Sequence, residues 1–235
     1  MVITTTSVGF ILLGLGLGFC GWRFWSAFRR EGSSGKTGFL LSLIFFGFAV
    51  QNGEMGIGTL FFANNSEALY YVLLLNNFLL FLLNLLSIYT LYYIFFPNVS
   101  PQFAMVLATV MGVAALTATV LVHPQPFLTV SNSIDLNLGR PLSVLIFYLL
   151  SINIVANAYI FIRLFLSSSV QAIKTLSLIL SIFAIAGIIN IFVLLFLSPG
   201  GVGNRIFDIG IGLIGLGFII FLGIFPIFKS RILKK

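Results

Sequence analysis

Seven long apolar stretches, separated by short polar breaks, fill almost the whole chain. Each is long enough for the roughly 20 residues that a helix needs to cross about 30 Å of hydrocarbon. None alternates apolar and polar residues as a barrel strand does, so the pattern predicts helices. We place these helices at residues 7–27, 38–62, 69–96, 102–122, 141–166, 174–197 and 207–228.

The expected fold class is therefore all-α, a polytopic membrane protein built as a seven-transmembrane-helix bundle. Composition agrees, because 60% of the residues are hydrophobic, 7% are charged and the mean hydropathy is +1.17, far outside the range of soluble domains. We expect residues 1–235 to form one transmembrane domain without a separate soluble domain. The lipid bilayer is then its main surrounding, and a multi-pass protein of the cell (plasma) membrane is the expected location.

Charge predicts the orientation. Of the 12 Lys and Arg residues, all but Arg140 and Arg205 fall on one side of the predicted membrane. The positive-inside rule then places the N-terminus outside and the C-terminus in the cytoplasm. Basic residues beside helix ends are attracted to anionic lipid headgroups, so the net charge of +7 does not imply a nucleic-acid partner.

Glycines mark two of the predicted helices. Gly14 and Gly18 lie on one face of the first helix, and Gly212 and Gly215 crowd the last. Small residues at such spacing let helix backbones approach closely in lipid. We therefore predict a helix-packing role for these four glycines, with the first and last helices in contact.

The inventory of reactive residues is too small for most enzyme sites. Cys20 is the only cysteine and His123 the only histidine, which leaves no internal disulfide and no two-histidine metal site. His123, beside Pro124, is expected to cap the fourth helix. The sequence thus predicts a non-enzymatic protein with no catalytic residue, no metal site and no cofactor.

Glu54 is the residue that most needs an explanation, because it lies well inside the second apolar stretch. A carboxylate in hydrocarbon costs several kcal/mol unless it is protonated, paired or hydrated. Gln51 and Glu54 share a face with Gly47 and Gly58 at helical spacing, and we expect this face to point into the bundle. A protonated Glu54 bonded to Asn52 or Asn77 is the structural alternative.

Amides on other helices complete a predicted polar cluster in the outer half of the bundle. Its members, the candidate ligand-binding residues, are Gln51, Glu54, Asn77, Asn153 and Asn190. The alternative for each asparagine is a hydrogen bond that merely holds two helices together. Asp208 begins the last helix, and Arg205, one turn earlier, is its expected partner.

The segment from Gly47 to Pro97 resembles part of a known family. A polar, acidic helix end, a short outer loop and a long aromatic helix make it similar to the second and third helices of the seven-helix sensor region of some bacterial histidine kinases. The resemblance implies a sensory function. We expect no kinase or other output domain in this chain, so its signal would pass to a partner chain.

Three functions are compatible with these features. The favoured one is a receptor-like or sensory bundle with a small polar pocket for a small-molecule ligand, signalling through a partner membrane or cytoplasmic protein. An accessory or scaffold subunit of a larger membrane complex is the first alternative. A small transporter or channel is the second, but the inner half of the predicted membrane has few polar residues beyond Asn84, Ser177 and Ser181, which favours an outward-facing pocket over a path through the membrane.

Overall fold

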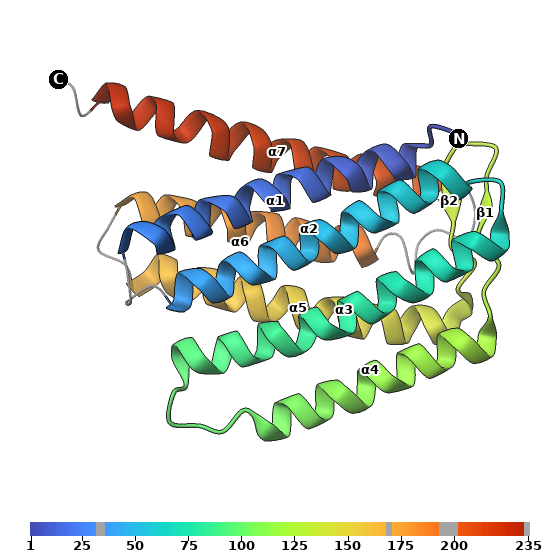
Figure 1. Ribbon diagram of the computed structural model, residues 1–235, viewed down its shortest axis with the longest axis horizontal. Helices are drawn as coiled ribbons and strands as arrows, with labels where there is room; N and C mark the ends of the chain where they lie inside the picture. Colours follow the sequence, from blue (N-terminus) through green and yellow to red (C-terminus); the bar gives the residue numbers. More distant parts are fainter. Residues whose placement is uncertain (32–35, 168–170, 193–201, 233–235) are drawn as a thin grey trace.

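The computed structural model describes residues 1–31, 36–167, 171–192 and 202–232, and within them the chain is almost entirely helical (Figure 1). The all-α fold class is confirmed. The seven helices are α1 (Thr5–Glu31), α2 (Lys36–Phe62), α3 (Ser66–Phe95), α4 (Gln102–Val122), α5 (Gly139–Ser167), α6 (Gln171–Phe192) and α7 (Val202–Ile232). Two short strands, β1 (Phe127–Leu128) and β2 (Ile134–Asp135), lie between α4 and α5.

Five of the described helices, α1 to α5, are long and apolar enough to cross a membrane. In α6 the described apolar part is shorter, Ser177–Phe192. This finding is consistent with a multi-pass integral membrane protein. The observed helices begin and end within a few residues of the predicted ones, and α4 matches its prediction at both ends. The predicted end of the sixth helix, at residue 197, lies outside the described residues.

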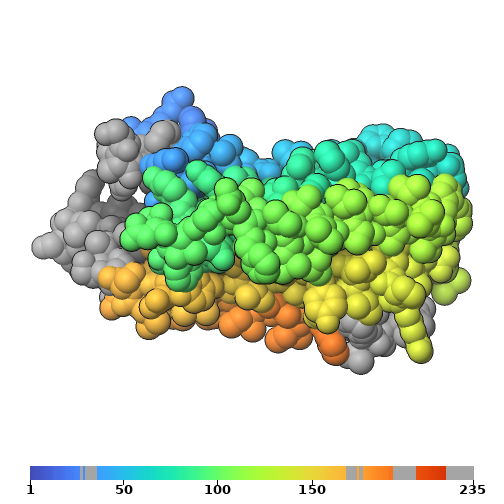
Figure 2. Space-filling view, turned by 90° about the horizontal axis from the view of Figure 1, so that it is seen from below, coloured from blue at the N-terminus to red at the C-terminus, as the bar shows by residue number. Residues whose placement is uncertain are grey.

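The helices are arranged as a ring of six with one helix outside it. Around the ring, α1 packs on α2, α2 on α3, α3 on α5, α5 on α6, α6 on α7, and α7 back on α1. Helix α4 contacts α3 and α5 from outside, and Figure 2 looks onto the face that it covers. Six helices therefore share one centre.

The two ends of the bundle differ. The N-terminus and the β1–β2 hairpin lie at one end, which we call the hairpin end (Figure 1). The other, the basic end, is where α1 and α5 finish and α2 and α6 begin. It carries Arg29, Lys36, Arg163 and Lys174.

The hairpin, which was not predicted from the sequence, ties distant segments together. Its two residue pairs are antiparallel, Phe127 with Asp135 and Leu128 with Ile134. The Ile134 N–H donates to Thr6 Oγ1 of α1 at 2.8 Å. Nearby, His123 ends α4 in the left-handed conformation, φ 45°, and its N–H donates to the Thr119 carbonyl at 3.0 Å. The predicted capping role of His123 is confirmed.

Asp208 is held by α1 rather than by Arg205. The carboxylate, in a residue only 3% exposed, accepts hydrogen bonds from Thr5 Oγ1 at 2.8 Å and from Thr6 Oγ1 at 2.7 Å. Arg205 is exposed, and the ion pair found among the described residues joins His123 to Glu67 instead. The predicted pairing was wrong because close packing of α1 on α7 brings two hydroxyl donors to the carboxylate.

The packing glycines of α1 serve two neighbours. A Cβ at Gly16 would come 2.7 Å from the Gly215 carbonyl oxygen of α7, whereas one at Gly14 would come 3.1 Å from backbone atoms of α2. Gly18 likewise faces α2, at Ala49. Two residues turn a helix by about 200°, so Gly14 and Gly16 lie on opposite faces.

On α7, Gly212 and Gly215 do face α1. Gly212 lies opposite Gly9, and a Cβ at Gly215 would come 2.5 Å from the Leu12 backbone. Helices α1 and α7 are therefore in contact, but Gly14 and Gly18 are not part of that contact.

Candidate ligand-binding site

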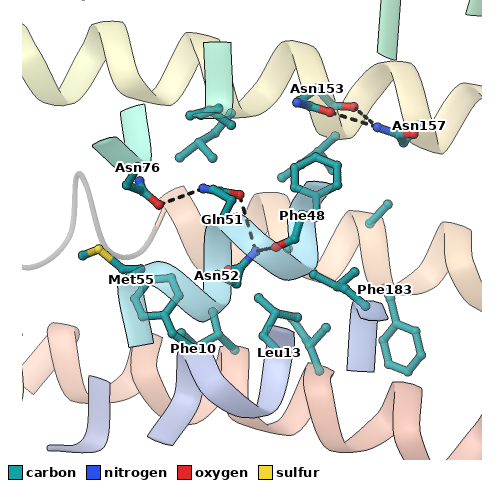
Figure 3. A pocket seen from close by; sticks show the side chains of 18 of the residues that line it. Phe10, Leu13, Phe48, Gln51, Asn52, Met55, Asn76, Asn153, Asn157 and Phe183 are labelled. Atoms are coloured by element: carbon teal, nitrogen blue, oxygen red, sulfur yellow. Dashed lines mark hydrogen bonds between the residues drawn. The ribbon is translucent and has the colours of Figure 1, made fainter. Parts of the chain in front are cut away.

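A cavity of about 220 Å³ lies at the centre of the six-helix ring (Figure 3). Leucine, isoleucine and phenylalanine side chains make up most of its wall, which all six helices contribute. Its polar lining consists of neutral amides: Gln51, Asn52, Asn76, Asn77, Asn153 and Asn157. A dry cavity of 150 Å³ already binds benzene, so this one is large enough for a small organic molecule.

The amides on α2 are held by their neighbours. Gln51 Nε2 donates to Asn76 Oδ1 of α3 at 3.0 Å, which links the two helices. Asn52 Nδ2 donates to the Phe48 carbonyl at 2.8 Å and lies 3.4 Å from Gln51 Oε1 (Figure 3). These bonds orient the amides without help from a charged group.

A second group of hydrogen bonds joins α3 to α5. Ser87 Oγ donates to Asn153 Oδ1 at 2.9 Å, and Asn157 Nδ2 donates to the same oxygen at 2.9 Å. Within the described part of the chain, Asn153 Nδ2 and Asn157 Oδ1 are buried without a partner. Buried amide groups are costly to leave unpaired, so this side of the cavity has unused hydrogen-bonding capacity.

Asn77 adds a third amide with a free group. Its Nδ2 donates to Thr119 Oγ1 of α4 at 3.2 Å. Its Oδ1 is buried and has no partner among the described residues. The wall thus carries spare acceptors at Asn77 and Asn157 and a spare donor at Asn153.

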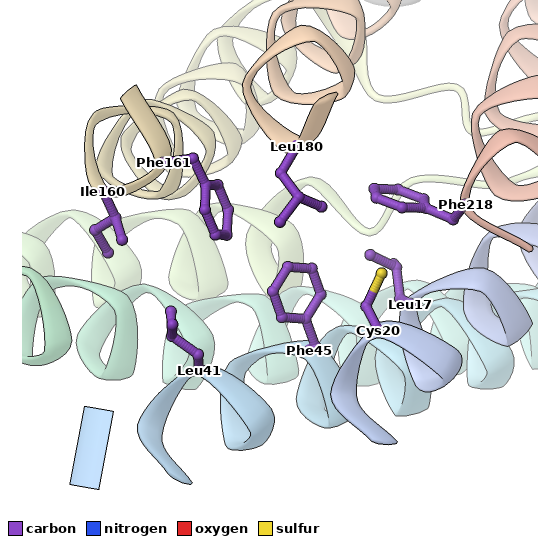
Figure 4. Packing of buried hydrophobic residues seen from close by; sticks show 8 residues of the cluster. All are labelled: Leu17, Cys20, Leu41, Phe45, Ile160, Phe161, Leu180 and Phe218. Atoms are coloured by element: carbon purple, nitrogen blue, oxygen red, sulfur yellow. The ribbon is translucent and has the colours of Figure 1, made fainter. Parts of the chain in front are cut away.

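Toward the basic end, an apolar cluster adjoins the cavity. Figure 4 shows how its side chains pack. We call it the apolar plug; it consists of Leu17, Cys20, Leu41, Phe45, Ile160, Phe161, Leu180 and Phe218. The plug draws residues from α1, α2, α5, α6 and α7, and Leu17, Phe45, Phe161, Leu180 and Phe218 also line the cavity. Cys20 is buried in it as a packing residue.

The structure brings together three of the predicted ligand-binding residues, Gln51, Asn77 and Asn153. Asn190 is elsewhere, since its Nδ2 donates to the Phe207 carbonyl at 3.0 Å and ties α6 to α7. A Cβ at Gly210 would come 2.5 Å from the Asn190 side chain, so this amide fits against a glycine of α7. Asn190 therefore joins two helices by a hydrogen bond, which was the predicted alternative to a role in ligand binding.

Glu54 does not face the cavity, contrary to the sequence prediction. It lies in a separate groove between α2 and α3 with Ile57, Tyr71 and Leu75. Three residues turn a helix by about 300°, which leaves Glu54 about 60° from Gln51. That rotation moves it from the interior to the boundary with the outer face. Its alternative partners do not bond to it; Asn52 Nδ2 donates to the Phe48 carbonyl and Asn77 Nδ2 donates to Thr119 Oγ1.

Asn52, Asn76 and Asn157 line the cavity but were not in the predicted set. Asn157 follows Asn153 by four residues, which places both on one helix face and was a usable signal. Asn52 and Asn76 directly adjoin other polar residues, so the sequence does not show which of two neighbours points inward.

The lining residues of the cavity are apolar or neutral amides, so it offers hydrogen bonds without a charge. Among the described residues, no group of three or more His, Cys, Asp or Glu side chains could hold a metal ion.

Comparison of the chain with protein-family models, curated proteins and solved structures found no match.

Proposed function

We propose that this protein is a receptor-like membrane sensor without enzymatic activity. In this proposal a small neutral molecule binds in the central cavity, and a partner chain receives the signal. The observation that carries the proposal is a cavity at the junction of six helices whose amides retain unused hydrogen-bonding groups.

The wall defines the ligand's chemistry. Apolar side chains favour a hydrophobic body, and a few amides favour one or two neutral hydrogen-bonding groups. A charged ligand would lose its hydration in the cavity without gaining an opposite charge. The volume of about 220 Å³ suits a molecule of one or two rings.

The cavity's position supports a sensory role. A ligand there would contact α1, α2, α3, α5, α6 and α7 at once. Ligands shift a conformational equilibrium by binding one arrangement more tightly than another. A molecule that touches six helices has many contacts that change when those helices move.

The topology is part of the same proposal: seven spans in the plasma membrane, with the hairpin end outside. Basic residues at the other end support it, as do the aromatic rings beside them. Lys36 Nζ lies 4.3 Å from the centre of the Tyr93 ring, and Arg163 Nε donates to the Tyr159 hydroxyl at 3.0 Å.

Cysteine labelling tests this orientation. In a Cys20→Ala background, Asn132→Cys should react with a membrane-impermeant maleimide on intact cells. Arg29→Cys should react only after the cells are permeabilised. The reverse pattern would show that the hairpin end lies inside.

Filling the cavity tests ligand binding. Gly187 of α6 lines the cavity, and an added Cβ would contact only Ile154 Cδ1, at 3.8 Å. Gly187→Leu should therefore occupy the space with little strain. With 2-naphthol, a neutral two-ring probe, in nanodiscs, we expect this variant to weaken binding at least about tenfold, which corresponds to about 1.4 kcal/mol.

Gly53→Leu is the matched control, because Gly53 lies outside the cavity and an added Cβ there meets nothing within 4 Å. It should bind the probe like the wild type. Equal binding by the wild type and Gly187→Leu would mean that the probe does not use the cavity.

A distance measurement separates a sensor from a passive binding protein. Spin labels at Arg29 and Arg163, at the basic end, should report a changed distance distribution when 2-naphthol binds. Gly187→Leu should show no change. Binding without a change in distance would count against a sensor, and copurification of a stoichiometric set of membrane subunits would then favour the accessory-subunit function.

A further inference from the structure

Glu54 occupies a groove on the outer surface of the bundle, separate from the central cavity. The groove runs between α2 and α3, and its lining consists of Glu54, Ile57, Gly58, Phe62, Ala68, Tyr71, Val72 and Leu75. None of these residues lines the cavity. The two sites therefore require separate explanations.

Two exposed apolar stripes flank the groove. On α2 the stripe consists of Val50, Ile57 and Phe61, and on α3 it consists of Tyr71, Leu75, Phe78 and Leu82. Each stripe spans 12 residues, and its end residues are about 16 Å apart along the helix. Glu54 falls between Val50 and Ile57 at helical spacing, so its carboxyl lies beside a surface that is otherwise apolar.

The carboxyl of Glu54 lacks a hydrogen-bond partner. Its Oε2 is buried and unpaired within the described part of the chain. Glu54 precedes Phe62, the last residue of α2, by eight residues, or about 12 Å along the helix. If α2 crosses the membrane, this depth is within the hydrocarbon, where a carboxyl is costly unless another group pairs with it.

We propose that this groove, defined by the eight residues above, docks a transmembrane helix of a partner protein that presents a Lys or Arg at the depth of Glu54. An open groove between two long apolar stripes matches the shape of a helix better than that of a small molecule, which favours enclosed pockets. The unpaired carboxyl supplies the charge complementarity. The proposal does not depend on a ligand in the central cavity.

A second copy of this chain is a poor occupant. In the sequence, Arg140 and Arg205 are the only basic residues near the hairpin-end starts of their helices, at the second residue of α5 and the fourth of α7. The nearest basic residue deeper in a helix is Arg23 of α1, about 27 Å along the helix from Thr5. Among the described residues, no basic residue thus has its Cα at the depth of about 12 Å at which Glu54 lies.

Synthetic peptides test the proposal. A polyleucine transmembrane helix with one Lys eight residues from its hairpin-side end is compared with the same helix without Lys. Energy transfer from the labelled protein in liposomes measures association. We expect the Lys peptide to associate at least about tenfold more strongly, because its charge meets the carboxyl. Moving the Lys by seven residues should abolish this preference.

Glu54→Gln keeps the shape of the side chain but cannot ionise to pair with a Lys, so it should abolish the preference for Lys. Asp135→Asn is the matched control, since it neutralises a carboxyl of strand β2 outside the groove. It should retain the preference, as should the cavity-filling variant Gly187→Leu. A failure of 2-naphthol to bind would therefore not contradict the docking of a helix in the groove. Likewise, a failure of the Lys peptide to associate would not contradict ligand binding in the cavity.

Four results would overturn the inference. Equal association of both peptides with the wild type would show that charge has no role. An unchanged preference in Glu54→Gln would place the Lys elsewhere. Glu54-dependent association between two differently labelled copies of the protein, or displacement of the Lys peptide by decylamine, would identify a second copy or a small amine as the better occupant.

Discussion

Gln51 and Glu54 lie three residues apart on one helix, yet they belong to two unlike sites. Gln51 lines a cavity surrounded by six helices and bonds to Asn76. Glu54 lies in an open groove between two helices with a buried, unpaired oxygen. The contrast shows that a rotation of about 60° separates an interior polar residue from a surface one.

The chemistry of the two sites follows their surroundings. Amides are neutral and carry both donors and acceptors, so they satisfy one another inside a bundle. An ionised carboxyl group can accept hydrogen bonds but cannot donate them, so it needs a donor or a cation beside it. The cavity therefore suits a neutral ligand, whereas the groove suits a positively charged partner.

The largest expected effect is the chemical labelling of the Glu54 carboxyl in the groove. Dicyclohexylcarbodiimide partitions into lipid, where the O–H of a protonated carboxyl adds across one of its C=N bonds. The resulting O-acylisourea rearranges to a stable N-acylurea by migration of the acyl group to nitrogen. In liposomes we expect this adduct at Glu54 and none in Glu54→Gln, as measured by peptide mass spectrometry. Asp208 is buried and bonded to Thr5 and Thr6, so it should stay unmodified. Labelling of Asp208 but not of Glu54 would show that the Glu54 carboxyl is not accessible from the lipid.

A pair of phenylalanines compares the interior with the groove's flank. Phe45, 5% exposed, belongs to the apolar plug, whereas Phe61, 57% exposed, belongs to the α2 stripe. Phe45→Ala should lower the free energy of unfolding by about 3–5 kcal/mol, because it leaves a cavity. Phe61→Ala should change it by about 0.5 kcal/mol or less. Reversible unfolding in mixed micelles measures both, and similar losses would mean that the plug is not part of the core.

Replacing the two polar residues of α2 by leucine should have opposite effects on stability. Glu54→Leu removes an unpaired buried oxygen, so the isolated protein should gain about 1 kcal/mol. Gln51→Leu strands the Asn76 acceptor, so stability should fall by about 1 kcal/mol. Thermal unfolding in detergent measures both shifts. A loss in both variants would indicate that Glu54 has an internal partner.

The smallest expected effect concerns the α3–α5 contact. Ser87→Ala and Asn153→Ala each remove one side of the hydrogen bond between these residues. A double-mutant cycle should give an interaction energy of about 0.6 kcal/mol, the average for such bonds between membrane helices. Ser87→Ala with Gln51→Leu is the control pair, and it should be additive. An interaction energy of zero for Ser87 and Asn153 would show that this hydrogen bond does not stabilise the contact between α3 and α5.

The sequence by itself determined the features that depend only on residues adjacent in the chain. The helices follow from continuous apolar runs, and the cap at His123 follows from the adjacent Pro124. Most predicted helix ends lie close to the observed ones for the same reason. Hydropathy and turn chemistry are local properties, which a single chain displays without reference to its fold.

Only the tertiary structure decided which face of each helix meets which neighbour. The hairpin depends on a bond from Ile134 to Thr6, 128 residues away, and Asp208 depends on threonines of α1. Each helix carries apolar side chains on all of its sides, so hydropathy does not distinguish its lipid-facing side from its interior side. The packing of the helices determines which side faces the interior, and for this reason Gln51 and Glu54 lie in different sites.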